Sequence, residues 1–99
     1  MRYKFDWDTD KAQKNIRKHR LSFRQAATVF RDPNQLVLYD EEHSVNEDRW
    51  ITSGIDESGV LRVVIHTFEQ IETDLCLIRI ISARKATRAE EQQYRERNQ

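Results

Sequence analysis

The chain contains very few of the residues that build disulfide-rich proteins, zinc folds or nucleotide-binding loops. Its 99 residues include one cysteine, one proline and two glycines. One cysteine allows neither an internal disulfide nor a cysteine-based zinc site, and the apolar neighbours of Cys76 predict a packing role in the core. Two glycines, Gly54 and Gly59, are too few for a glycine-rich phosphate-binding loop.

Long apolar runs are missing as well. No segment approaches the roughly 20 apolar residues that span a bilayer, and the N-terminus, MRYKFDWD, lacks the apolar region of a secretory signal. We therefore expect a cytoplasmic protein without a membrane partner, folded as one domain over residues 1–99. The chain also has no serine-hydrolase elbow and no histidine pair with zinc-ligand spacing, so we expect neither metal nor cofactor.

Charged residues make up 34% of the chain, and their signs are unevenly distributed although the net charge is zero. Residues 1–31 carry nine Lys/Arg against three Asp, residues 32–78 two Arg against eleven Asp/Glu, and residues 79–99 six Lys/Arg against three Glu. Two basic ends that meet on one surface would attract a polyanion. The alternative is that these charges are solvated faces of surface helices.

The spacing of apolar and capping residues predicts an α+β fold. Alternation predicts a strand over residues 2–7, and capping residues predict helices over 8–20 and 22–31. Further strands are expected at 36–39, 49–55, 60–68 and 75–83, and Thr87 with Glu90 forms the capping box of a last helix. The order β-α-α-β-β-β-β-α predicts a small antiparallel sheet with the two N-terminal helices packed on one face and a C-terminal helix.

Strand register decides which side chains share a sheet face. A hairpin turn at residues 56–59 would place Arg49 opposite His66, and a second turn at residues 69–74 would bring Arg79 beside them. These three side chains are therefore expected together on one polar face. The opposite face, covered by the helices, would hold Trp50, Leu61, Val63, Ile65, Ile78 and Ile80.

Four blocks carry the most specific patterns: FDWDTDKAQKNIRKHRLSFRQAATVF at 5–30, DEEHSVNEDRWITSG at 40–54, VVIHT at 63–67, and RIISARKATRAEEQQY at 79–94. In these blocks the chain resembles the BrnT toxins, the ribonuclease halves of bacterial type II toxin–antitoxin pairs. The resemblance implies a RelE-like fold and an endoribonuclease that cleaves mRNA and inhibits translation. It also implies a BrnA-like ribbon-helix-helix antitoxin as partner, with operator DNA bound only through that complex.

The chain departs from the family pattern at two places. Thr9 stands where the family often has proline, and it still suits a helix start. Arg20 stands where the family often has glycine, which makes a left-handed turn there more strained.

Metal-free RNA cleavage requires a base for the 2′-hydroxyl, cations for the phosphorane and an acid for the leaving 5′-oxygen. Arg49 and Arg79 are expected to clamp the scissile phosphate, because the planar guanidinium binds phosphate oxygens in pairs. His43, with Glu47 as its charged neighbour, and His66 are the candidate acid and base.

Further residues are expected to bind RNA or its phosphates: Lys18, His19, Ser82, Arg84, Lys85 and Tyr94. Structural roles compete with each of these, such as ion pairing for the arginines and packing for the tyrosine. The competing function is a non-catalytic binding module that regulates transcription with a ribbon-helix-helix DNA-binding protein.

Overall fold

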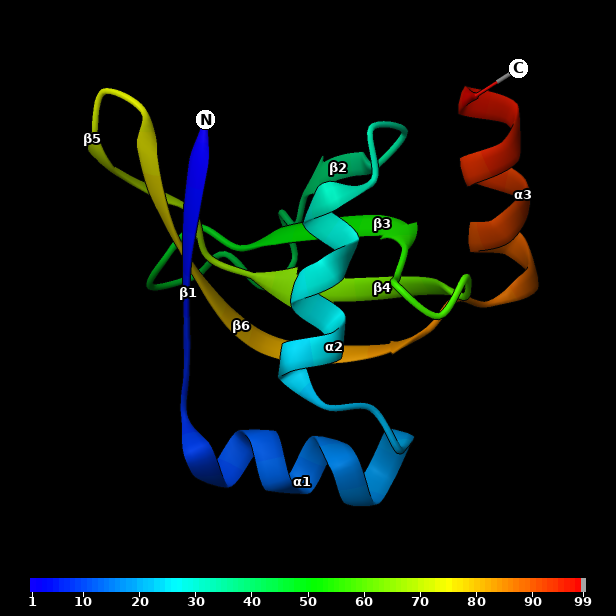
Figure 1. The fold of residues 1–99 in the computed structure, drawn as a ribbon, viewed down its shortest axis with the longest axis horizontal. Coiled ribbons are helices and arrows are strands. Elements are labelled where there is room, and N and C mark those ends of the chain that lie inside the picture. The colour runs from blue at the N-terminus through cyan, green and yellow to red at the C-terminus, as the bar shows by residue number, and fades with distance from the viewer. Residues whose placement is uncertain (99) are drawn as a thin grey trace.

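One sheet organises the chain in the computed structural model, which describes residues 1–98 (Figure 1). The strands run in the order β1-β6-β4-β3-β2, with β5 paired to β6. The predicted α+β class is confirmed. The elements are β1 (Arg2–Trp7), α1 (Thr9–His19), α2 (Phe23–Ala27), the 3₁₀ helix η1 (Thr28–Arg31), β2 (Leu36–Tyr39), β3 (Trp50–Ile55), β4 (Leu61–His66), β5 (Glu69–Glu72), β6 (Leu75–Lys85) and α3 (Arg88–Arg97).

Two features of the sheet differ from the predicted order. β1 and β6 pair in parallel, whereas the other strand pairs are antiparallel. The segment expected as a turn between two strands contains a short additional strand, β5, which pairs with the start of β6. The sheet is therefore mixed, and the element order contains one strand more than predicted.

The helices begin where their capping residues predict. The Asp8 carboxylate accepts hydrogen bonds from two backbone amides of α1, and the Ser22 hydroxyl accepts one from Gln25. Thr87 and Glu90 form the expected capping box of α3. At the end of α1, Arg20 adopts the left-handed conformation with φ of 53°, which is the strained turn that the sequence predicts.

α2 lies across one face of the sheet and covers the core, and α1 lies beside β6 at the side of the sheet (Figure 1). The Asn15 side chain anchors α1 by bonding the backbone of Leu21 and both backbone groups of Ala83 in β6. The buried core cluster consists of Leu21, Phe23, Ala26, Val29 and Phe30 from the helical segments and Val64, Ile78, Ile80 and Ala83 from the strands.

The register of the β3–β4 hairpin is one residue away from the prediction. The turn has five residues, Asp56–Val60, so Ile55 pairs with Leu61 and Trp50 pairs with His66. A shift of one residue moves every side chain of a strand to the opposite face. His66 therefore faces the helices with Val64, while Val63 and Ile65 belong to the other face.

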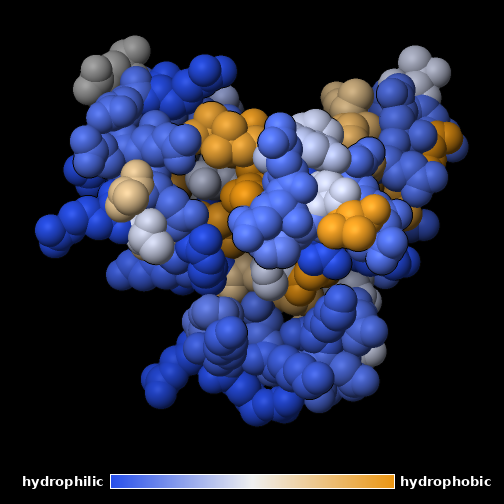
Figure 2. Space-filling view, turned by 180° about the vertical axis from the view of Figure 1, so that it is seen from behind, coloured by the Kyte–Doolittle hydropathy of each residue, from blue (hydrophilic) through white to orange (hydrophobic). Residues whose placement is uncertain are grey.

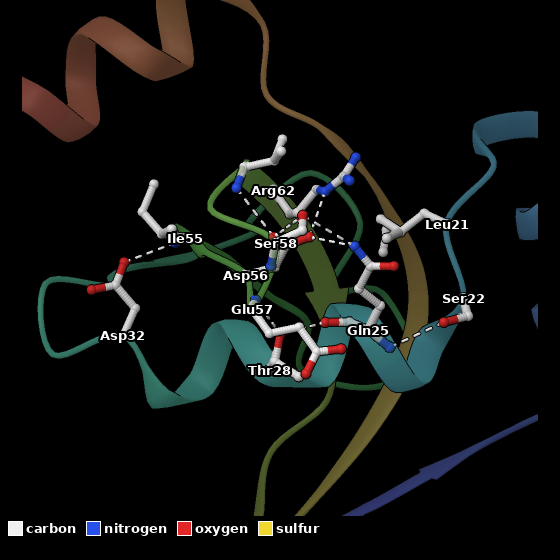
Figure 3. Close-up of polar contacts among 12 residues, drawn as sticks. Leu21, Ser22, Gln25, Thr28, Asp32, Ile55, Asp56, Glu57, Ser58 and Arg62 are labelled. Carbon is white, nitrogen blue, oxygen red and sulfur yellow. Dashed lines mark hydrogen bonds and ion pairs between the residues drawn. The ribbon is translucent and has the colours of Figure 1, made fainter.

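A buried carboxylate explains the length of this turn (Figure 3). The Asp56 side chain accepts hydrogen bonds from Ser58, Val60, Gln25 and the Arg62 guanidinium, the last at 2.8 Å. Burial alone would raise the pKa of Asp56, but these hydrogen bonds outweigh it and hold that pKa well below its usual range. The network also fastens α2 to the hairpin, because Gln25 lies on that helix.

Candidate active site

The outer face, defined as the sheet face away from α2, has an open pocket of about 350 Å³. Figure 2 shows apolar residues exposed in separate patches on this face, with hydrophilic side chains between and around them. Three isoleucines from neighbouring strands contribute the apolar lining: Ile51 in β3, Ile65 in β4 and Ile81 in β6. The polar lining consists of Asp40, Glu42, His43, Arg49, Ser82 and Arg84.

The loop between β2 and β3 is held closed at its base by hydrogen bonds. The backbone amide of Asp40 donates to the Arg49 carbonyl at 2.9 Å. The Ser44 hydroxyl donates to the Asp40 carbonyl at 2.5 Å and accepts from the Arg49 amide at 2.9 Å. Both loop ends are therefore fixed relative to each other, and this fixes the side chains that the loop directs toward the pocket.

His43 is held by a buried carboxylate within this loop. Its Nδ1 lies 3.1 Å and 3.0 Å from the two carboxylate oxygens of Asp40. The Asp40 side chain is 10% exposed and the His43 side chain 60% exposed. Because a carboxylate only accepts hydrogen bonds, Nδ1 carries the proton, and Nε2 is the open ring nitrogen. Nε2 has no hydrogen-bond partner within residues 1–98.

Arg49 is the least occupied arginine of the pocket. Its Nη2 lies 3.9 Å from the Glu47 carboxylate, and its buried Nε has no hydrogen-bond partner among the described residues. Arg84 is engaged instead, because its two Nη atoms donate to Glu90 at 2.7 Å and 3.0 Å. This contact raises the pKa of Arg84 and lowers the pKa of Glu90 to about 2.

The predicted position of His66 on the outer face is wrong. Its ring is 2% exposed and packs edge-on against Phe30, with ring centroids 4.9 Å apart. Nδ1 donates to the Thr67 carbonyl at 2.9 Å, and Nε2 accepts from the Thr52 hydroxyl at 2.7 Å. Burial lowers the pKa of His66. The register shift explains this position, and both ring nitrogens are occupied there.

A family model described as the ribonuclease toxin BrnT of type II toxin–antitoxin systems matches residues 7–90. The chain belongs to the BrnT family. A crystal structure of the BrnT ribonuclease toxin from Brucella abortus has the same fold, with a TM-score of 0.61 and 23% sequence identity. The match covers 89% of this chain and 100% of that chain. A comparison with curated proteins gives no match. The family identifies this chain as a ribonuclease toxin of a type II system.

Arg79, predicted as the second phosphate clamp, lies beside the pocket of this BrnT chain rather than in its lining. Its guanidinium lies 3.5 Å from the Asp6 carboxylate. Glu47 and Arg79 together line two neighbouring clefts. Because Glu47 also lies within reach of Arg49, it links the two arginines across the rim of the outer face.

The remaining predicted residues are scattered over the BrnT fold. Ser82 lines the pocket, Lys85 is exposed at the end of β6, and Lys18 and His19 lie on α1, away from the pocket lining. Tyr94 donates its hydroxyl to Asp32 at 2.6 Å, which joins α3 to the rest of the chain. Burial and this carboxylate raise the pKa of Tyr94 to about 12.

Sequence reasoning missed Asp40 and Glu42, which line the pocket beside His43. The signal was the position of Asp40, which directly follows a predicted strand and stands three residues before a histidine.

Two further findings bear on residues 1–98 alone. No group of three or more histidine, cysteine or acidic side chains is arranged to hold a metal ion, and no helix is long and apolar enough to cross a membrane.

Proposed function

We propose that this chain is a metal-independent endoribonuclease that cleaves mRNA in the outer-face pocket and thereby inhibits translation in the cytoplasm. The observation that carries the proposal is one pocket lined both by His43, whose Nε2 is open, and by Arg49, whose guanidinium makes only a 3.9 Å contact to Glu47. A general base and an unoccupied cation are the two groups that phosphodiester cleavage needs without a metal.

The reaction begins with the phosphodiester bound by Arg49 and the Ser82 hydroxyl, while the isoleucines contact a neighbouring base. His43 removes the proton of the 2′-hydroxyl through Nε2, and the 2′-oxygen forms a bond to phosphorus. The bond from phosphorus to the 5′-oxygen then breaks, and this oxygen takes a proton from water in the open pocket. The products are a 2′,3′-cyclic phosphate and a free 5′-hydroxyl. Arg49 stabilises the added charge of the phosphorane.

Three of the expected residues have supporting roles in this proposal. Glu47 acts as the counter-ion of Arg49, and Arg79 attracts the RNA backbone from the rim. His66 is assigned to the core, because its two nitrogens are already bonded beneath the helices.

The first test compares RNA cleavage with and without EDTA. The wild-type protein is expected to cleave at the same rate in both, leaving 2′,3′-cyclic phosphate ends. His43→Ala is expected to lose about 10²–10⁴ of that rate, the usual contribution of a general base. The matched control is His19→Ala, which removes a histidine that does not line the pocket. Cleavage that stops with EDTA, or that survives His43→Ala, would reject the mechanism.

The partner proposed for this toxin is a BrnA-like ribbon-helix-helix antitoxin, which binds operator DNA in the complex. Expression of the chain alone should arrest growth, and coexpression with such an antitoxin should restore it. His43→Ala expressed alone should be tolerated if cleavage causes the arrest. Arrest by His43→Ala at full strength would favour the non-catalytic binding module instead.

A further inference from the structure

We infer that Asp40 is the positioning residue of this active site, fixing both the tautomer and the orientation of the His43 ring. This inference rests on the proposed function, because it assigns a second residue to the same reaction. It adds a residue that holds the general base without touching the RNA.

Asp40 holds His43 through hydrogen bonds to one ring nitrogen and to the backbone amide. Both carboxylate oxygens of Asp40 lie within 3.1 Å of Nδ1, and Oδ1 also accepts the backbone amide of His43 at 3.3 Å. A ring held at Nδ1 by an acceptor presents Nε2 as a lone pair, which is the form a base requires. Without the carboxylate, the ring is free to rotate and to place its proton on Nε2.

Asp40 is itself fixed more firmly than the histidine it holds. Its side chain is 10% exposed, and both of its backbone groups are bonded, to Arg49 and to Ser44. The Ser44 hydroxyl therefore links the backbone of Asp40, whose carboxylate holds His43, to the backbone of Arg49. The sequence DEEHS provides Asp40, His43 and Ser44 within five consecutive residues.

Other charged groups line the pocket around His43. Glu42 comes from the same loop, Arg49 from the loop end before β3, and Arg84 from β6. Among residues 1–98, Asp40 provides the carboxylate that contacts the ring. Arg84 is already paired with Glu90, so it does not compete for that carboxylate.

The test uses Asp40→Asn, which keeps the shape of the side chain and an oxygen for the His43 amide but removes the charge. We expect kcat for RNA cleavage to fall about 100-fold, within the range for general base catalysis, with KM changed less than about twofold. The ring nitrogens in ¹⁵N NMR spectra should report protonated Nδ1 in the wild type and a shift toward protonated Nε2 in the variant. Glu41→Gln removes the same charge from the neighbouring exposed position and should change neither measurement.

Two results would overturn the inference. One is wild-type cleavage by Asp40→Asn, and the other is an Nε2-protonated His43 in the wild-type protein. The second measurement needs no variant, so it decides the matter even if Asp40→Asn does not fold. Failure of the proposed function would appear separately, as normal cleavage by His43→Ala, whatever tautomer His43 adopts in the wild-type protein.

Discussion

At the scale of single residues, the three arginines of the outer face differ in how much of their charge is already used. Arg84 makes two short bonds to Glu90, Arg79 one long contact to Asp6, and Arg49 only a contact of 3.9 Å to Glu47. Arg49 therefore has the least engaged guanidinium of the three, with only a 3.9 Å contact to Glu47, which makes it the first site for the substrate.

Variants of Arg49 test whether this arginine is the main phosphate-binding group of the outer face. Arg49→Ala should lower single-turnover cleavage by about 10²–10³, as loss of one oxyanion donor does. Arg49→Lys keeps the charge but loses the planar fork, so we expect it to recover less than a tenth of the lost rate. Arg84→Ala is the comparison, and its effect should be smaller because Glu90 occupies that guanidinium. Equal effects of Arg49→Ala and Arg84→Ala would contradict the assignment.

His66 makes the stability of the fold dependent on pH. Burial lowers its pKa in the folded state below the value of 6.5 of an unperturbed histidine. The unfolded chain therefore binds a proton that the folded chain does not, and stability falls as pH drops below about 6.5. Above that pH both states are neutral at this residue and its contribution is constant.

Urea unfolding between pH 7.5 and pH 5 measures this effect. The free energy of unfolding of the wild type should fall with a slope of at most about 1.4 kcal/mol per pH unit from this one proton. In His66→Gln that part of the slope should vanish, although the variant is less stable at every pH. An identical slope in both proteins would show that the ring is protonated in the folded state.

At the scale of elements, capping residues predicted the structure better than turns did. Asp8, Ser22 and Thr87 each cap the helix expected from their neighbours, because a side-chain bond to the first backbone amides is a local event. The β3–β4 turn depends instead on Asp56 meeting Arg62 across the hairpin and Gln25, which is 31 residues away in sequence. Sequence spacing does not reveal that meeting, so the register and the position of His66 were mispredicted.

Arg20 ends α1 in a conformation that favours glycine. Its φ of 53° costs about 1–2 kcal/mol for a residue with a side chain. Arg20→Gly removes this strain but loosens the unfolded chain by about 0.4–1 kcal/mol, so a gain of about 0.5 kcal/mol is expected. Thermal unfolding should report a Tm higher by about 2–4 °C. Arg17→Gly, inside the same helix, should lower stability by about 1 kcal/mol, and a similar loss in Arg20→Gly would contradict the argument.

The last helix depends on few contacts with the rest of the chain. α3 has no fully buried side chain within the described residues, and it is joined to the other elements by the Tyr94 hydroxyl on Asp32 and by the pairing of Glu90 with Arg84. Tyr94→Phe keeps the ring and removes only the hydroxyl. We expect a loss of about 1–2 kcal/mol, because the acceptor is a carboxylate that stays behind.

Hydrogen exchange and urea unfolding together test the anchoring role of Tyr94. The amides of α3 should exchange faster in Tyr94→Phe, while RNA cleavage stays at the wild-type rate. Tyr3→Phe removes a hydroxyl from a partly exposed tyrosine of β1 that makes no hydrogen bond within residues 1–98, and it should leave stability unchanged. Reduced cleavage by a fully folded Tyr94→Phe would return Tyr94 to the set of RNA contacts.

At the scale of the whole molecule, the two sheet faces have different tasks. α2 and η1 close one face over the core, and the other face holds the open pocket between the β2–β3 loop and the strands. The sequence predicted a polar outer face and four of the nine residues that line its pocket, His43, Arg49, Ser82 and Arg84, because residue type and local order were sufficient for these. It did not predict which cations are free, since this depends on Glu90 and Asp6 reaching their partners in the folded chain.

The two faces also predict how RNA binding responds to salt. The pocket and Arg79 lie on the outer face, whereas the cations of α1, among them Lys14 and Lys18, do not line the pocket. Each phosphate contact with single-stranded RNA contributes about 0.7 to the slope of log affinity against log salt. In a His43→Ala background that prevents cleavage, Arg49→Ala with Arg79→Ala should therefore reduce this slope by about 1.4. Lys14→Glu with Lys18→Glu should leave the slope unchanged, because neither lysine lines the pocket or the cleft that holds Arg79. A reduction of similar size in the α1 variant would show that RNA extends along α1, with Lys18 as one of its contacts.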